Sequence, residues 1–267
     1  RLILTSVRAA RVSRAARLRK RAFREADGRF LAEGPQAVRE ALATPDSVVE
    51  VFATDEVATR HPELPVAAAA VGVPWVRCSG AVVAHLSDTV TPQGVVAVCR
   101  MPTVTVADAV PQGARLVSLL AQVRDPGNAG TVIRVSDAAG ADGVVLSHGS
   151  VDPHNAKCVR ASAGSLFHVP VAVGPEPAEL VATARAAGLT VLAADGAADT
   201  HLDDLDPAAL ARPTAWLFGN EAWGLPPALR ALADRVVAVP IYGRAESLNL
   251  STAAAVCLYA SARAQHA

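Results

Sequence analysis

From Arg115 onward, short apolar runs alternate with segments of helical composition, and this alternation limits the possible fold more than any other feature. Each run is followed by a loop rich in Gly, Pro, Asp or Asn; the runs are RLVSLLAQV, GVVLSH, FHVPVAV, LTVLAAD and TAWLFGN. Near-continuous apolar strands separated by helices are typical of a mostly parallel sheet with helices on both faces. Ligands of such sheets bind beyond the carboxyl ends of the strands, so functional residues are expected in the loops that follow them.

The first hundred residues carry a shorter version of the same alternation. VVEVFAT, VPWVRCS and GVVAVCR read as strands, and RFLAEGPQAVREAL predicts an extended entry followed by a helix. That helix would place one apolar face inward, formed by Ala37, Val38, Ala41 and Leu42. The stretch between the two alternating regions contains two prolines and a glycine. We therefore expect a small α/β domain over residues 1–100, a linker over 101–114 and a larger α/β domain over 115–267.

Composition narrows the class of protein. Hydrophobic residues make up 51% and charged residues 19% of the chain, a globular composition that can bury cores. The four cysteines lack a CxxC pair, and no histidine lies at zinc-ligand spacing, so we expect neither a disulfide framework nor a metal; they are Cys78, Cys99, Cys158 and Cys257. No signal peptide opens the chain, and no run reaches the roughly 20 apolar residues of a membrane span. A cytoplasmic protein without membrane contact is expected.

The net charge of zero hides a strong asymmetry. Residues 1–29 hold ten Lys and Arg against two acids, so this segment carries +8 and the remainder −8. Six of its arginines recur at three- and four-residue spacing and would share one face of a helix: Arg8, Arg11, Arg14, Arg17, Arg21 and Arg24. A solvated helix face is one interpretation. Since like charges at this spacing repel unless an anion neutralises them, a phosphate backbone is the other.

The loop Arg124–Gly130 follows the first strand of the larger domain. Asp, Pro, Gly and Asn are turn residues, so Asp125 to Gly127 can be a plain turn, and Asn128 can cap the next helix. Arg134 is harder to explain in this way, because it interrupts an apolar helix one turn further on. A planar guanidinium at this position can reach a phosphate or carboxylate across the loop.

The loop Leu217–Pro226 places glycines on both sides of Glu221. Glycine lacks a Cβ and accepts positive φ, so Gly219 and Gly224 would let backbone approach a ligand closely. A turn with a surface glutamate is the alternative. Neither GxGxxG nor GxxxxGK[ST] occurs in the chain, so a dinucleotide site or a P-loop lacks its motif.

The closing stretch Val239–Tyr259 has more polar side chains than a helix start requires. A strand and a turn lead into an Ala-rich helix through the cluster Arg244, Glu246, Ser247, Asn249 and Ser251. Four of these side chains offer an oxygen within six residues, whereas one or two suffice to cap a helix. The surplus predicts a functional site.

Three motifs occur in one fixed order along the chain: DPGNAGTVIR, FGNEAWGL and VPIYGRAESLNLSTAAA. By these motifs the chain resembles the SpoU, or TrmH-like, branch of the SPOUT RNA 2′-O-ribose methyltransferases. RFLAEGPQAVREAL and TPQGVVAV resemble the substrate-binding domain of the rRNA-modifying members, which has an L30e-like fold. The resemblance covers nearly the whole chain.

The resemblance implies a mostly parallel, trefoil-knotted SPOUT domain that binds S-adenosylmethionine and forms a homodimer. Matching positions would hold the cofactor at Gly219, Val239 and Leu248, with Leu217, Phe218 and Ile241 nearby. The catalytic and RNA-phosphate groups would be Asn128, Arg134, Glu221, Ser247 and Asn249. Ala222 departs from a glycine common in the family, and Ile241 from a frequent methionine, but neither change removes a functional side chain.

The implied reaction is methylation of a ribose 2′-hydroxyl, which restricts the substrate to RNA because DNA lacks this group. The L30e-like domain and the basic segment favour a structured RNA, and we expect rRNA of the large subunit rather than tRNA. A tRNA 2′-O-methyltransferase, a non-catalytic RNA-binding or ribosome-assembly protein and a generic nucleotide-binding enzyme are the alternatives. Routine modification and antibiotic self-resistance are equally compatible with the sequence.

Overall fold

The computed structural model describes residues 3–267, so Arg1 of the basic segment lies outside the described residues. These residues form two compact units. Unit 1 comprises the described part of Arg1–Thr103 together with His154–Phe167, and unit 2 comprises Val104–Pro153 and His168–Ala267.

Unit 1 is built on a four-stranded sheet in the order β1-β4-β2-β3, in which β4 is antiparallel to both neighbours and β3 is parallel to β2. The strands are β1 (Arg29–Glu33), β2 (Val48–Ala53), β3 (Trp75–Arg77) and β4 (Val95–Arg100). The helices are α1 (Ala10–Arg17), α2 (Arg21–Asp27), α3 (Pro35–Ala43), α4 (Asp55–Arg60), α5 (Glu63–Ala70), α6 (Gly80–Leu86) and α9 (Ala156–Ser162). The predicted apolar face of α3 is confirmed, because all four of its residues are buried.

The basic segment belongs to the core of unit 1. It forms two helices, α1 and α2, separated by a turn at residues 18–20. Val12, Ala15 and Leu18 are buried in one hydrophobic cluster with residues of α6 and the sheet. The segment is therefore a packed pair of helices with a charged outer surface.

Helix α9 lies within residues 115–267, which the sequence assigned to the larger domain, yet it packs against β1 in unit 1. The ring centroids of Phe30 and His154 lie 4.7 Å apart. The ring centroid of Phe167 lies 6.0 Å from that of Phe30, and Phe167 belongs to the short 3₁₀ helix η1 (Ser165–Phe167). Arg160 of α9 also pairs with Glu33 at 3.3 Å. These contacts join two segments that are more than a hundred residues apart, which no local pattern reveals.

Unit 2 contains a seven-stranded sheet in the order β7-β6-β5-β10-β8-β11-β9, with all neighbouring strands parallel. The predicted parallel sheet is therefore confirmed. The strands are β5 (Leu116–Leu120), β6 (Gly143–Leu146), β7 (Val171–Val173), β8 (Thr190–Ala194), β9 (Thr200–His201), β10 (Thr214–Phe218) and β11 (Arg235–Ala238). The helices are α7 (Val106–Ala109), α8 (Pro126–Ala138), α10 (Pro177–Ala186), η2 (Leu202–Asp204), α11 (Pro207–Leu210), α12 (Pro227–Arg230) and α13 (Leu250–Gln265).

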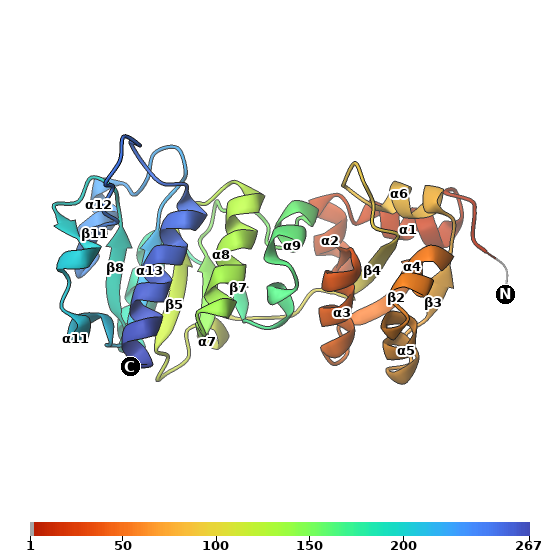
Figure 1. The fold of residues 1–267 in the computed structure, drawn as a ribbon, viewed down its shortest axis with the longest axis horizontal. Helices are drawn as coiled ribbons and strands as arrows, with labels where there is room; N and C mark the ends of the chain where they lie inside the picture. The colour runs from red at the N-terminus through yellow and green to blue at the C-terminus, as the bar shows by residue number, and fades with distance from the viewer. Residues whose placement is uncertain (1–2) are drawn as a thin grey trace. The chain divides into compact units, whose positions relative to one another are not determined.

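Helices cover both faces of this sheet. Helices α8 and α13 lie side by side over one face (Figure 1). On that side the indole N–H of Trp216 donates to the hydroxyl of Ser261 in α13 over 2.9 Å, so a buried polar group is satisfied. The next residue along β10, Leu217, belongs to the cluster on the opposite face together with Leu180 of α10. Alternate residues of β10 thus serve different layers.

The predicted linker over 101–114 contains the helix α7. Thr105 and Asp108 form a reciprocal capping box at its start. Ala109 is fully buried and lies so close to β6 that a Cβ added to Gly143 would be 2.7 Å from its Cα. Part of the predicted linker is therefore a short helix, α7, that packs in unit 2.

Candidate active site

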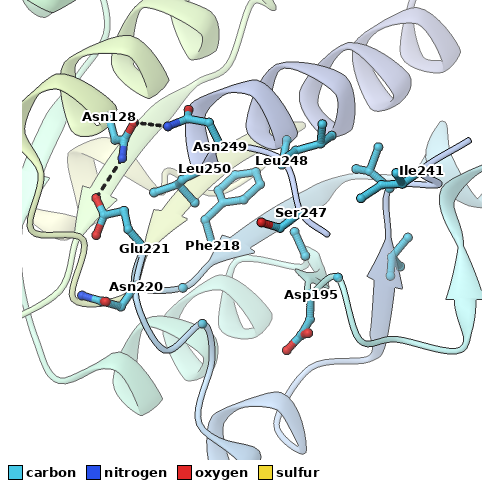
Figure 2. A pocket seen from close by; sticks show the side chains of 17 residues that line it. Asn128, Asp195, Phe218, Asn220, Glu221, Ile241, Ser247, Leu248, Asn249 and Leu250 are labelled. Carbon is cyan, nitrogen blue, oxygen red and sulfur yellow. Dashed lines mark hydrogen bonds between the residues drawn. The ribbon is translucent and has the colours of Figure 1, made fainter. Parts of the chain in front are cut away.

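A cavity of about 350 Å³ lies in unit 2 among the segments that follow β8, β10 and β11 (Figure 2). The first turns of α8 and α13 complete its wall through Asn128 and Leu250. This is the place at which parallel sheets bind ligands, because the carboxyl ends of the strands and the starts of the helices meet there.

Three polar side chains form a continuous hydrogen-bonded bridge at the edge of the cavity (Figure 2). The side-chain nitrogen of Asn249 donates to the side-chain oxygen of Asn128 over 2.9 Å. The side-chain nitrogen of Asn128 in turn donates to Glu221 Oε1 over 3.2 Å. The bridge therefore connects the loops after β5, β10 and β11.

The carboxylate of Glu221 holds the loop after β5 in place. Its Oε1 accepts the backbone N–H of Asp125 over 3.0 Å, and its Oε2 accepts that of Arg124 over 3.1 Å. With Asn128, three N–H groups donate to its two oxygens. Glu221 thus acts in this structure as an acceptor that joins two loops.

Asn249 supplies the cap of α13. Its side-chain oxygen accepts the backbone N–H of Ser251 over 2.9 Å and that of Thr252 over 3.4 Å. Capping therefore uses one of the candidate oxygens in this stretch. Ser247 lies outside the cap and lines the cavity, and its hydroxyl has no hydrogen-bond partner within residues 3–267.

The loop after β10 depends on two glycines. A Cβ added to Gly219 would lie 2.5 Å from the carbonyl oxygen of Gly224 and 2.7 Å from the backbone nitrogen of Leu225. Gly224 itself has a φ of +66°, which L residues rarely adopt. Two backbone hydrogen bonds between Asn220 and Gly224, of 3.0 and 2.9 Å, close the loop. The close approach that the sequence predicted occurs within the loop's own backbone.

Five of the six residues predicted at the cofactor site line the cavity: Phe218, Gly219, Val239, Ile241 and Leu248. The sixth, Leu217, does not. It is fully buried in the core on the far side of the sheet, because side chains alternate between faces along β10.

Three further polar or flexible residues line the cavity without having been predicted: Asp195, Gly196 and Asn220. Asp195 and Gly196 follow β8, and an Asp-Gly pair directly after an apolar run is the signal that marks them. Asp195 accepts a hydrogen bond from Arg230 over 3.3 Å. Asn220 donates to the carbonyl oxygen of Gln122 over 2.7 Å and so helps to hold the loop after β5.

Arg134 lies outside the cavity lining. It is exposed on α8, opposite the buried residues Val132, Ile133 and Ser136. Its guanidinium makes no hydrogen bond or ion pair within the described part of the chain. Of the five predicted catalytic residues, the cavity brings together the other four.

Arg24 was predicted on the exposed basic face, but the structure places it in the interior of unit 1. Its side chain is buried, and its guanidinium donates to the carbonyl oxygens of Leu18 and Arg19, both over 3.0 Å. These carbonyls lie at the C-terminal end of α1, where helices leave acceptors unpaired. Arg24 therefore connects α2 to α1 and is not available to an RNA surface.

The other five arginines of that face are exposed. Arg11 pairs with Glu50, Arg17 with Asp27 at 3.6 Å and Arg21 with Glu25 at 2.6 Å. Arg8 and Arg14 have no ion-pair partner among the residues that the structure describes. Surface pairs of this kind contribute little to stability, so an incoming phosphate can replace the carboxylates.

No helix within residues 3–267 is long and apolar enough to cross a membrane. The described residues also contain no group of three or more His, Cys, Asp or Glu side chains that could hold a metal ion. The four cysteines are buried and form no disulfide in this part of the chain.

Comparison with known protein families finds two matching profiles along the chain. The profile of the SpoU rRNA Methylase family matches residues 115–259. The profile of the MRM3-like substrate binding domain matches residues 9–97.

Individual relatives extend over most of the chain. The 23S rRNA (guanosine(2553)-2′-O)-methyltransferase RlmP of Bacillus subtilis is 38% identical over 86% of this chain and 87% of its own. A crystal structure of an RNA 2′-O ribose methyltransferase covers 99% of both chains with a TM-score of 0.85 at 30% identity. The SpoU methyltransferase AviRb from Streptomyces viridochromogenes, solved with AdoMet, gives a TM-score of 0.83 at 32% identity and covers 96% of this chain and 98% of its own.

Proposed function

Because the chain belongs to the SpoU rRNA methylase family, we propose that it transfers a methyl group from S-adenosylmethionine to a ribose 2′-hydroxyl of large-subunit ribosomal RNA. The relative RlmP bears a name that specifies this reaction on 23S rRNA. The observation that carries the proposal is the cavity beside the Glu221–Asn128–Asn249 bridge, where a ligand site and a polar edge meet.

The cavity has the properties that S-adenosylmethionine requires. Ile241 and Leu248 line it, yet each leaves 37% of its surface exposed, so a planar apolar group such as adenine would cover them. The backbone near Gly219 and Val239 supplies polar groups beside this apolar surface. When bound, the cofactor supplies a methyl group activated on a positively charged sulfur.

The residues of the chain then have to align the ribose hydroxyl. Ser247 offers an unengaged hydroxyl at the cavity, and we assign it to hold the target ribose. Asn249 and Asn128 fix the polar edge through their mutual hydrogen bond. Since Glu221 already accepts three N–H groups, we assign it to positioning these loops.

In this proposal Arg134 binds the RNA and does not remove the hydroxyl proton. A guanidinium keeps its proton in proteins, so it cannot serve as the general base. Its exposed fork is suited to bind the phosphate next to the target ribose in two-point geometry and to stabilise negative charge on the attacking oxygen.

We propose that residues 1–100 bind the RNA and that residues 115–267 catalyse the transfer, with 101–114 connecting them. The match of residues 9–97 to a substrate-binding profile supports this division. The exposed arginines of the basic segment would contact phosphates, namely Arg8, Arg11, Arg14, Arg17 and Arg21.

A homodimer is the assembly we propose. Helix α13 exposes Val256 and Tyr259 on one side, in line with Thr252 and Arg263 at helical spacing. Exposed apolar side chains of this kind favour a covering partner. Tyr259→Glu should therefore produce monomers in sedimentation experiments, whereas Arg263→Gln, at the end of the same face, should leave the dimer intact.

From family membership we also propose a trefoil knot in the segment after β11, and a cytoplasmic location where ribosomal RNA is assembled. In this proposal the closing segment is threaded through the knot before Asn249 reaches its hydrogen-bond partner Asn128. A chain cyclised while folded and then denatured should migrate as a more compact ring than one cyclised while unfolded.

The deciding experiment is methyl transfer from labelled S-adenosylmethionine to unmodified 23S rRNA, 16S rRNA and tRNA transcripts, followed by mapping of the modified nucleotide. We expect label in 23S rRNA and none when the mapped ribose is replaced by its 2′-deoxy form. Label in tRNA alone would show that tRNA, and not 23S rRNA, is the substrate. RNA binding without any transfer would favour a non-catalytic assembly protein, and the mapped position would separate routine modification from antibiotic self-resistance.

A further inference from the structure

Trp223 and Arg124 form an exposed pair at the rim of the cavity that the proposed chemistry does not use. The guanidinium carbon of Arg124 lies 5.1 Å from the centroid of the Trp223 ring. Trp223 lies between two residues that line the cavity, Glu221 and Gly224, but does not line it itself. Its side chain is 50% exposed. The indole is therefore exposed on a loop whose neighbouring residues form part of the cavity wall.

The pair is held firmly although it is exposed. Trp223 belongs to the turn that the two hydrogen bonds between Asn220 and Gly224 close. The backbone N–H of Arg124 donates to Glu221 in the same turn over 3.1 Å. Both side chains thus project from backbone that is anchored to the Glu221–Asn128–Asn249 bridge. A ligand bound by them would therefore have a fixed position relative to the cavity.

The charge of Arg124 is unmatched. Its guanidinium has no carboxylate partner within residues 3–267, and the oxygens of the adjacent Glu221 already accept N–H groups. An exposed cation beside an exposed aromatic face attracts both a nucleobase and its phosphate. A second copy of this chain would have to bury that unpaired charge, which is unfavourable. RNA is thus the favoured occupant.

We propose that Trp223 and Arg124 form a platform on which an unpaired base of the RNA stacks, at or next to the nucleotide whose ribose is methylated. This inference rests on the proposed function, because a ribose presented to the cavity brings its base to the rim. The platform positions the RNA and has no part in binding the cofactor.

Substitutions separate these roles. Trp223→Ala should lower kcat/KM for 23S rRNA about ten-fold, within the range of measured base–aromatic stacking, while Trp223→Phe, which keeps a ring, should lose less. Arg124→Gln keeps the backbone N–H that Glu221 needs and should give an intermediate loss. Affinity for S-adenosylmethionine, measured by calorimetry, should stay unchanged in all three. Val173→Ala removes a similarly exposed apolar side chain elsewhere in unit 2 and should have no effect.

Tryptophan fluorescence gives a readout that does not depend on turnover. The chain has three tryptophans, of which Trp216 is fully buried, so a Trp75→Phe protein retains Trp223 as its exposed reporter. Saturating 23S rRNA should quench this signal, because a stacked base quenches indole emission. The double variant Trp75→Phe/Trp223→Phe should show no such quenching.

Each outcome decides the matter. Wild-type kinetics in Trp223→Ala, or unquenched Trp223 at saturating RNA, would overturn the platform. A shift of Trp223→Ala from dimer to monomer in sedimentation would assign the indole to a second copy and overturn it as well. If the wild-type protein transfers no methyl to any RNA while Trp223 is still quenched, the proposed function fails and the stacking site remains.

Discussion

Asn249 donates a hydrogen bond from its side-chain nitrogen to the side-chain oxygen of Asn128 over 2.9 Å, across 121 positions of sequence. The oxygen of the same Asn249 amide caps α13, and the nitrogen of Asn128 continues the chain of hydrogen bonds to Glu221. The start of the last helix is thereby fixed to the loops after β5 and β10. A change at the centre of this bridge should therefore act on all three segments.

Asn128→Asp tests that coupling. The new oxygen would face Glu221 Oε1 across a 3.2 Å separation that a hydrogen bond now spans, and two carboxylates repel each other. We expect methyl transfer to fall at least about 100-fold and the free energy of unfolding to fall by about 1–3 kcal/mol, the cost of an unmade hydrogen bond. Steady-state kinetics and urea unfolding measure the two effects.

The control for this change is Asn155→Asp. Asn155 caps α9 through its side-chain oxygen, and aspartate caps helices equally well. This variant should keep both activity and stability. Near-normal turnover in Asn128→Asp would mean that the bridge does not matter for catalysis.

Gly219→Ala should damage the loop after β10. An alanine Cβ would collide with the backbone of Gly224 and Leu225, which cannot move without opening the two hydrogen bonds that close the loop. We expect S-adenosylmethionine affinity to fall at least about ten-fold and unfolding free energy to fall by about 1–3 kcal/mol. Gly196→Ala lines the same cavity, but its Cβ would meet nothing within 4 Å, so it should bind the cofactor more nearly normally.

Glu33 should make the stability of unit 1 depend on pH. Its Oε1 accepts from Asp88 N and from Arg160, but its Oε2 has no partner in the described residues. Burial raises the pKa of this carboxyl above its ordinary value of 4.5, outweighing the opposite effects of the Asp88 N–H and Arg160. The folded state then holds the proton more tightly than the unfolded state. The stability from this group is thus fully present below the ordinary pKa and is lost as pH rises through the folded value.

Glu33→Gln should remove that loss. Urea unfolding at about pH 4.5 and about pH 7.5 should show the variant gaining stability relative to the wild type as pH rises. Glu63→Gln is the opposite case, because the hydrogen bond from Arg39 lowers the pKa of Glu63. The stability of the Glu63→Gln variant relative to the wild type should therefore fall as pH rises. The change should be small, because this site is exposed. Equal pH profiles for wild type and Glu33→Gln would contradict the argument.

Arg8 and Arg14 should contribute to RNA binding through charge alone. They are exposed and have no ion-pair partner in residues 3–267. If both contact phosphates, Arg8→Gln/Arg14→Gln should reduce the slope of log affinity against log salt by about 1.4–1.8. Arg8→Lys/Arg14→Lys keeps both charges and should keep the slope. An unchanged slope in the glutamine variant would identify this part of the basic segment as a solvated surface.

Local patterns predicted much of this architecture. Apolar strands and their following loops indicated a parallel sheet with a ligand site at one edge, and Asn128, Glu221 and Asn249 meet there. The same rule applied to the apolar run before Asp195 would have added that residue.

The remaining features depend on contacts between distant segments. Leu217 and Phe218 are adjacent in an apolar strand, and only the register of the sheet decides which one faces the cavity. Arg24 has the spacing of a surface arginine, but the bend between α1 and α2 turns it onto the carbonyls of Leu18 and Arg19. The segment His154–Phe167, which contains α9, joins unit 1 through Phe30 and Glu33, which a helical pattern by itself cannot indicate.

Arg134 gives the sharpest test of the proposed mechanism, because it lies outside the cavity and is exposed on α8. Arg134→Lys keeps the positive charge but loses the planar fork that binds a phosphate at two points. If the fork aligns the RNA, turnover at saturating RNA should fall at least about ten-fold, since alignment and charge stabilisation both act in the transition state. Affinity for S-adenosylmethionine and the salt dependence of RNA binding should not change. Arg14→Lys, where a point charge suffices, should keep normal turnover. Near-normal turnover in Arg134→Lys would show that charge alone is enough and would remove the fork from the mechanism.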